Sequence, residues 1–122
     1  MPRENIILSK ESIFACFDIY PVSPGHTLVV TKRHIESWFE TTAEERRAID
    51  DAIFELKDML DAKFIPDGYN IGVNIGRDAG QTIDHLHVHL IPRYRGDMDD
   101  PWGGVRGVIP DKRLYPKIGP KK

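Results

Sequence analysis

Short runs of apolar residues recur near the start of the chain, and their composition is typical of strands. They lie at residues 6–8, 13–17 and 26–31 and are rich in β-branched and aromatic side chains, which pack well on a pleated surface. Pro21 and Pro24 interrupt the chain between the second and third runs, where proline restricts the backbone to extended or turn conformations. The pattern predicts a hairpin followed by a third strand.

The longest patterned run has the spacing of an amphipathic helix. Thr42 and Glu45 match a capping box, and apolar residues then recur every three or four positions. These apolar residues are Ile49, Ala52, Ile53, Leu56, Leu60 and Phe64. Charged residues, Glu45 among them, occupy the other positions and indicate a solvated surface. The Pro-Asp-Gly sequence at residues 66–68 ends the helix, and we expect a shorter helix at residues 37–40.

Two more strands are predicted in the second half of the chain. Residues 69–76 alternate between apolar and polar positions, and so do residues 85–91. The loop at residues 77–80 is short enough to favour antiparallel pairing of these two strands. Further on, we expect a short strand at residues 105–109 and a frayed tail at residues 116–122. The overall prediction is an α+β fold, with an antiparallel sheet of about five strands backed by one long helix and a short one.

Three of the five histidines, His85, His87 and His89, fall at alternate positions in the run HLHVHLI. Because successive side chains of a strand point to opposite faces, we expect the three rings on one face, a histidine row, with the intervening apolar residues in the core. Neighbouring rings would lie roughly 6.5 to 7 Å apart, close enough to act on one phosphate-sized group. Asn74, on the polar face of the preceding run, is expected beside this row.

Imidazoles are used in this way either to bind zinc or to act on phosphate groups. Zinc ligands must converge to about 2 Å from the metal, whereas the outer rings of the row would start roughly 13 Å apart, so we predict no metal site there. Phosphate chemistry needs one ring as the nucleophile and others as donors or orienting groups, a geometry that is easier to satisfy.

The composition is that of an ordinary globular protein, and it narrows the range of functions. The 122 residues are 40% hydrophobic and 30% charged, and they fit one domain over residues 1–122. A net charge of −2 argues against a broad basic footprint for nucleic acid. Cys16 is the only cysteine, which excludes an internal disulfide. Because no run approaches the ~18 to 20 apolar residues of a membrane span and the start does not look like a signal peptide, we expect a cytoplasmic protein without a membrane partner.

Two motifs resemble the signatures of the histidine triad (HIT) superfamily of nucleotide hydrolases and transferases. HLHVHLI at residues 85–91, preceded by AGQT at 79–82, is similar to the signature of the superfamily, and DIYPVSPGHTLVV at residues 18–30 resembles its other motif. The resemblance covers residues 6–97 and leaves residues 98–122 as a C-terminal tail segment. The PRYRGD sequence that follows the histidines looks closer to the fragile-histidine-triad branch, which cleaves dinucleoside polyphosphates.

The resemblance implies a sheet that extends across a homodimer and a reaction at the α-phosphorus of a nucleotide, such as a diadenosine polyphosphate. In the family the middle histidine, here His87, attacks phosphorus and forms a nucleotidyl-histidine intermediate that is released to water. His89 is expected to hydrogen-bond the phosphate oxygens, while His85 and His26 orient the working rings. The expected nucleotide-binding residues are Asp18, at the ribose, with Ile19, Asn74, Gly80, Gln81 and Thr82. No cofactor is required, and any magnesium is expected to accompany the substrate.

The same residues are also consistent with other functional hypotheses. Within the superfamily the chain could be a purine nucleoside phosphoramidase or an adenylyl-transferring phosphorylase. From other classes, the chain could be a nucleotide-binding protein without turnover or a zinc-binding module. His34 matches a family position too, and we expect it to be structural.

Overall fold

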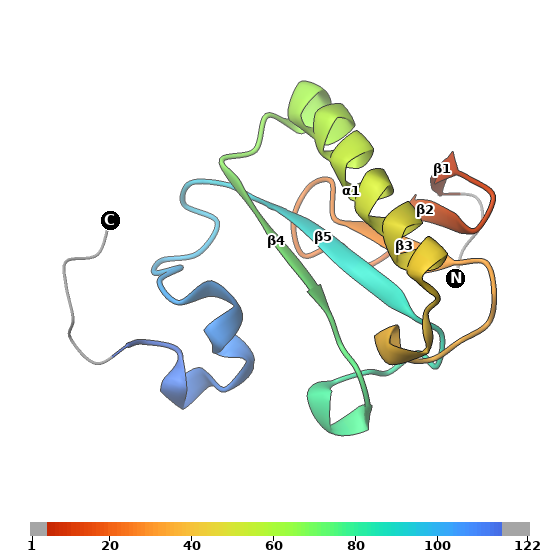
Figure 1. Cartoon of the computed structure of the whole chain (residues 1–122). Helices are drawn as coiled ribbons and strands as arrows, with labels where there is room; N and C mark the ends of the chain where they lie inside the picture. The colour runs from red at the N-terminus through yellow and green to blue at the C-terminus, as the bar shows by residue number, and fades with distance from the viewer. Residues whose placement is uncertain (1–4, 116–122) are drawn as a thin grey trace.

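The computed structural model describes residues 5–115, in which five strands form one antiparallel sheet (Figure 1). They are β1 (Ile6–Ser9), β2 (Ile13–Phe17), β3 (Thr27–Thr31), β4 (Gly68–Val73) and β5 (His87–Arg93), in the spatial order β1-β2-β3-β5-β4. The chain forms the β1 to β3 meander, crosses to the far edge as β4 and returns as β5 between β3 and β4. The predicted α+β fold and the antiparallel pairing of the last two strands are confirmed.

The long helix α1 (Ala43–Phe64) packs across one face of the sheet (Figure 1). Its capping box is formed as predicted, because the Thr42 side chain accepts from the Glu45 N–H and the Glu45 carboxylate accepts from the Thr42 N–H. The apolar side chains buried along it are those of Ile49, Ala52, Leu56 and Leu60, and Ile53 and Phe64 are partly buried. Although α1 has 22 residues, no helix within residues 5–115 is long and apolar enough to cross a membrane.

Glu45 contradicts the prediction that all charged residues of this helix are solvated. Its side chain is only 7% exposed, and its carboxylate oxygens accept hydrogen bonds from the Arg33 guanidinium at 2.8 and 3.0 Å. A buried carboxylate is tolerated when it is paired and hydrogen-bonded in this way. The hydrogen bond from Arg33 is the main reason why the pKa of Glu45 falls to about 2. This ion pair ties the start of α1 to the segment after β3.

Two short 3-10 helices lie in the connections. The helix predicted at residues 37–40 is confirmed as η1 (Trp38–Glu40), capped by the Ser37 side chain. The loop between β4 and β5 contains η2 (Arg77–Ala79).

The two faces of the sheet have different roles. On one face Val29, Val88 and Leu90 belong to the core that α1 covers. On the other face, Leu28 and Val30 of β3 pair directly with His89 and His87 of β5. Because directly paired residues of antiparallel strands point to the same side, His87 and His89 lie on the face away from α1. We call this side of the sheet the histidine face.

His85 does not belong to the histidine face, so the prediction of three rings in one row is wrong. β5 begins at His87, and His85 lies in a bend before the strand. The N–H of Leu86 donates to the Ile35 carbonyl oxygen at 2.7 Å, and β3 ends at Thr31. In this register β3 has no residue opposite His85, although the alternating pattern in the sequence begins there.

The strand predicted at residues 105–109 is also wrong. The segment forms the 3-10 helices η3 (Gly104–Val108) and η4 (Pro110–Lys112), and η3 contacts β4. Gly103 and Gly104 have φ values of +96° and +51°, left-handed conformations that turn the chain out of an extended path. A side chain at Gly103 would also collide with the backbone of Arg113. The tail predicted at residues 116–122 lies outside the described residues.

Candidate active site

His87 lies at the centre of the histidine face and is 9% exposed. Its Nδ1 lies 2.9 Å from the backbone carbonyl oxygen of His85. Since a carbonyl oxygen can only accept, the proton of the neutral His87 ring is on Nδ1, and Nε2 keeps its lone pair. The ring is therefore held in the tautomer that can attack an electrophile through Nε2.

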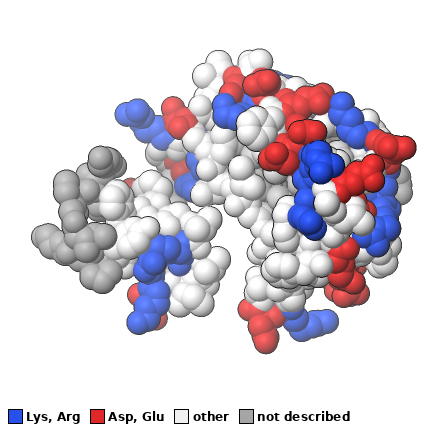
Figure 2. All heavy atoms as spheres, viewed as in Figure 1, with Lys and Arg blue, Asp and Glu red and all other residues white. Residues whose placement is uncertain are grey.

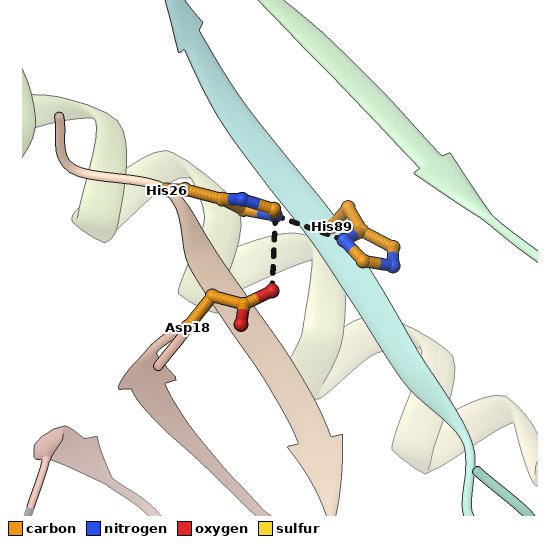
Figure 3. A group of neighbouring side chains, drawn as sticks. All are labelled: Asp18, His26 and His89. Carbon is orange, nitrogen blue, oxygen red and sulfur yellow. Dashed lines mark hydrogen bonds and ion pairs between the residues drawn. The ribbon is translucent and has the colours of Figure 1, made fainter. Parts of the chain in front are cut away.

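His89 is held in the opposite tautomer by a chain of hydrogen bonds, of which Figure 3 shows the contact between His26 and His89. The backbone N–H of Val22 donates to Nδ1 of His26 at 3.1 Å, so the proton of the His26 ring is on Nε2. This Nε2–H group donates to Nδ1 of His89 at 2.9 Å, which leaves the His89 proton on Nε2. The His87 and His89 ring centroids are 5.2 Å apart. A nucleophilic nitrogen and an N–H donor thus come from neighbouring rings.

Burial keeps the His26–His89 pair uncharged. His26 is 3% exposed, and desolvation lowers its pKa against the opposing effect of the Asp18 carboxylate. The pKa of His89 falls to about 4, mainly through burial and then through the nearby rings of His87 and His26. At pH 7 His89 is therefore a neutral donor.

Asp18 follows β2 and lies beside the same pair of rings. Its Oδ1 accepts from the N–H of Tyr20 at 2.9 Å, and its Oδ2 lies 3.5 Å from Nε2 of His26 (Figure 3). One carboxylate oxygen therefore shapes the turn, while the other lies beside the histidines, and the side chain is 18% exposed. Ile19, the next residue, is 52% exposed. These two predicted nucleotide-binding residues lie on the β2 side of the histidine pair.

A cavity of about 500 Å³ opens on the other side of His89, along β4. Gly72 of β4 pairs directly with His89, and a Cβ there would have no atom within 4 Å, so this glycine leaves the space beside the ring open. The cavity is lined by His26, His89, Asn74, Val22, Asn70, Ile71, Gly72 and Ile91, and by Gly104, Val105, Gly107 and Val108 of η3. A hollow with mostly uncharged atoms separates the C-terminal segment from the rest of the molecule in the space-filling view (Figure 2). A ligand in this cavity would contact His89.

Gln81 braces the loop between β4 and β5 through its side-chain amide. Its Oε1 accepts from the N–H of Gly76 at 2.9 Å, and its Nε2 donates to the carbonyl oxygens of Glu36 and Ile83 at 2.8 and 3.1 Å. The side chain is thus hydrogen-bonded to three backbone groups. To contact a phosphate it would have to exchange one of these hydrogen bonds.

The neighbouring residues of this loop are less constrained. Thr82 is exposed, and Gly80 has a φ of +96° that favours glycine. A Cβ on Gly80 would lie 3.9 Å from the amide nitrogen of Asn74. The structure therefore brings together Gly80 and Asn74, as well as the cluster of Asp18, His26 and His89.

His34 contacts His85, a pairing that the sequence did not reveal. The two Nδ1 atoms are 3.1 Å apart, and Nε2 of His85 lies 2.6 Å from the Thr31 carbonyl oxygen. Because that carbonyl accepts, Nδ1 of the neutral His85 ring has no proton and accepts from His34. These contacts anchor the residue whose own carbonyl sets the tautomer of His87.

The hydrogen bond from the Val22 N–H to His26 was not predicted either, because the residue types in a sequence do not show where a backbone donor will lie. The only signal was Pro21 and Pro24, which predicted a tight turn just before His26. In that turn the His26 N–H donates to the Ser23 carbonyl oxygen at 3.1 Å, and the ring folds back to Val22.

Within residues 5–115 one group of side chains is close enough to hold a metal ion. The possible ligand atoms of Asp18, His26 and His89 all lie within 4.8 Å of one another. Coordination through Nε2 of His26 would move that ring's proton to Nδ1, where it would face the Val22 N–H. The hydrogen-bond pattern therefore suits a proton on Nε2 better than a metal.

Comparison with known proteins agrees with this arrangement. The HIT domain family model matches residues 2–96. An uncharacterized HIT-like protein of Methanocaldococcus jannaschii is 41% identical over 111 residues, covering 90% of this chain and 85% of that protein. A bis(5'-adenosyl)-triphosphatase of Dictyostelium discoideum is 32% identical over 98 residues, covering 80% of this chain and 66% of that protein.

Solved structures of HIT family proteins have a similar fold. The crystal structure of a HIT family protein from Bacillus anthracis superposes with a TM-score of 0.73 at 38% identity, covering 76% of this chain and 66% of that one. Both the sequence match and the fold therefore lead to one conclusion. The chain belongs to the HIT domain family.

Proposed function

We propose that this protein is a nucleotide hydrolase that cleaves at the α-phosphorus of a dinucleoside polyphosphate through a nucleotidyl-His87 intermediate. The observation that carries the proposal is the hydrogen bond from Nδ1 of His87 to the His85 carbonyl oxygen, which leaves Nε2 as the unprotonated nitrogen. The hydrogen-bond acceptor that prepares the nucleophile is thus a backbone atom.

The reaction would proceed in two displacements at phosphorus. In the first, the lone pair on Nε2 of His87 forms an N–P bond while the bond from phosphorus to the bridging oxygen breaks, and the leaving phosphate keeps that electron pair. In the second, water forms a P–O bond, the N–P bond breaks, and the ring recovers its lone pair. The water releases one proton to solvent, and the products are a nucleoside monophosphate and the remaining nucleotide.

The residues around His87 suit the charge that develops on the transferred phosphoryl group. His89 would donate its Nε2–H to a nonbridging oxygen, since the His26 contact keeps the proton on that nitrogen. Because His89 is neutral, it would donate this hydrogen bond as a fixed dipole and would not transfer its proton in the reaction. Asp18 and Ile19 would contact the ribose of the attacked nucleotide from the β2 side.

The loop between β4 and β5 would contact the phosphates. We propose that Asn74, Gly80 and Thr82 face the leaving phosphate and that Gln81 joins them when a ligand replaces one of its backbone partners. Any magnesium would enter with the substrate and not through a protein site. The predicted homodimer involves a second chain and stays a prediction; light scattering should then give twice the 13.9 kDa of one chain.

The substrate class is supported by the activity for which the Dictyostelium relative is named, that of a bis(5'-adenosyl)-triphosphatase. A direct comparison of substrates separates this activity from those of a phosphoramidase and a phosphorylase. Diadenosine triphosphate, a nucleoside phosphoramidate and adenylyl sulfate should be incubated in parallel, each with and without inorganic phosphate. We expect the diadenosine compound to be cleaved fastest and without need of phosphate.

His87→Asn is the variant that tests the mechanism in the same assay. We expect turnover to fall by several orders of magnitude, because a covalent step is lost, while AMP binding and the melting temperature stay close to those of the natural protein. A variant that keeps more than about a tenth of the original kcat would contradict the assignment. Absence of product from every substrate would instead indicate a nucleotide-binding protein without turnover.

A further inference from the structure

Asn70 of β4 has its side-chain amide fixed in one orientation by Arg93. The guanidinium Nη1 donates to Oδ1 of Asn70 at 2.7 Å, while Nε and Nη2 donate to the two carboxylate oxygens of Asp97, both at 2.8 Å. Since arginine only donates, the oxygen of Asn70 must face Arg93 and the NH₂ group must face away. The bidentate pair with Asp97 holds Arg93 in place.

The NH₂ group of Asn70 faces the C-terminal segment and the cavity beside His89. A Cβ on Gly104, at the start of η3, would lie 3.6 Å from that amide nitrogen. Asn70 and Gly104 both line the 500 Å³ cavity, and they also line an adjoining cavity of about 470 Å³. Asn70 therefore presents an N–H donor where the two cavities meet.

The cavity is lined by residues of β4 beyond His89 as well as by Val22 and His26, so part of it lies on the far side of His89 from Asp18. The strand order places β5, with His87 and His89, between β3 and β4. Figure 3 shows Asp18 and β4 on opposite sides of His89. If the attacked nucleotide extends toward Asp18, the part of the substrate beyond the bond that breaks has room on the β4 side. The apolar walls there, from Val22, Ile91, Val105 and Val108, suit the faces of a nucleobase.

We propose that Asn70 binds the leaving half of the substrate, with its NH₂ group donating to an acceptor atom of the departing nucleoside. This inference rests on the proposed function and assigns a residue to the second nucleoside of a dinucleoside polyphosphate. Asn70 is then a determinant of substrate choice, and it takes no part in the attack by His87. Substrates with a small leaving group would not reach it.

Two variants and two substrates test the proposal. Asn70→Ala removes the donor without adding charge, and Asn70→Asp keeps an oxygen for Arg93 while replacing the NH₂ group. The substrates are diadenosine triphosphate, whose leaving group contains a nucleoside, and the p-nitrophenyl ester of AMP, whose leaving group does not. KM and kcat are measured for each combination, and the melting temperature shows whether the variants are folded.

We expect both variants to raise KM for diadenosine triphosphate about three- to tenfold, the loss of one hydrogen bond, and to change kcat/KM for the ester less than about twofold. Equal effects on the two substrates, or no effect on either, would overturn the proposal. An effect of Asn70→Asp alone would also overturn it, because repulsion of the polyphosphate would then explain the result. These outcomes leave the role of His87 intact, whereas failure of the natural protein to cleave either substrate would contradict the proposed function itself.

Discussion

Nδ1 of His87 donates to the carbonyl oxygen of His85, two residues earlier in the chain, at 2.9 Å. The partner is a backbone atom, so no substitution at position 85 removes the acceptor itself. What holds this acceptor in place is the His85 side chain, through Thr31 and His34. The reactive tautomer of His87 thus depends on a short piece of backbone anchored at the end of β3.

The tautomer and charge of His89 can be measured directly. We expect its ¹⁵N NMR signals to show a neutral ring with the proton on Nε2 and a titration midpoint near the pKa of about 4, far below the ordinary 6.5, because burial and two neighbouring rings oppose protonation. Between these pH values the unfolded chain binds this proton more readily, so His89 makes the fold less stable as the pH falls from about 6.5 to about 4. A midpoint near 6.5, or a proton on Nδ1, would contradict the hydrogen-bond chain from Val22.

Asp18 is predicted to accept hydrogen bonds from the ribose hydroxyls. Asp18→Ala should weaken the binding of ribonucleotides by about 1.5 to 3 kcal/mol, the scale of charge-assisted hydrogen bonds, and that of deoxyribonucleotides much less. Calorimetry with AMP and its 2'-deoxy analogue measures the difference. Asp18→Asn is the control for the turn, because an amide oxygen can still accept from the Tyr20 N–H. Equal losses for both sugars would mean that Asp18 only shapes the turn.

The Glu45–Arg33 pair should stabilise the fold at neutral pH. Glu45→Gln keeps an oxygen for the Thr42 N–H but removes the charge, so we expect the free energy of unfolding to fall by about 1 to 3 kcal/mol. The lower part of this range is expected because the Arg33 side chain is 52% exposed and screened by water. Glu44→Gln, at an exposed position of the same helical turn, is the control and should change stability by less than about 0.5 kcal/mol.

The same pair predicts a pH dependence. The pKa of Glu45 is about 2 in the fold and 4.5 ordinarily, so its contribution is complete above about pH 5 and is lost as the pH falls to about 2. Denaturation of the natural protein and Glu45→Gln should therefore give a constant difference above pH 5 that vanishes near pH 2. A difference that persists at pH 2 would indicate a packing effect and not an ion pair.

Metal analysis tests whether the cluster of Asp18, His26 and His89 is a zinc site. Protein purified without added zinc should contain well under one equivalent per chain, and chelation should leave mononucleotide binding unchanged, because Nε2 of His26 is needed as a donor to His89. Stoichiometric zinc that leaves together with activity would reverse this conclusion.

The parts of the fold that the sequence predicted well are those governed by local chemistry. The capping box at Thr42 and the spacing of the apolar residues defined α1, and the short loop after β4 defined how it pairs with β5. The errors occurred where a distant contact overrides the pattern. The sequence could not show that Arg33 buries Glu45, or that two left-handed glycines at 103 and 104 turn the segment into η3.

In the candidate site, too, the features set by local sequence were predicted and those set by distant contacts were not. The sequence pattern placed His87 and His89 on one strand face, where the structure has them. His85 was misplaced because the strand begins where β3 can pair, and that limit is set by tertiary structure. The fixed amide of Asn70 likewise depends on Arg93, which is 23 residues away.

The stereochemical course at phosphorus tests the central claim most directly, because it reports the number of displacements even when no intermediate accumulates. A dinucleoside polyphosphate with a single configuration of sulfur on the α-phosphate is hydrolysed in ¹⁸O-labelled water, and the configuration of the thiophosphate product is determined. Attack by His87 followed by attack by water inverts phosphorus twice, so the account predicts overall retention. Inversion would mean that water attacks the substrate in one step, and it would contradict a nucleotidyl-histidine intermediate.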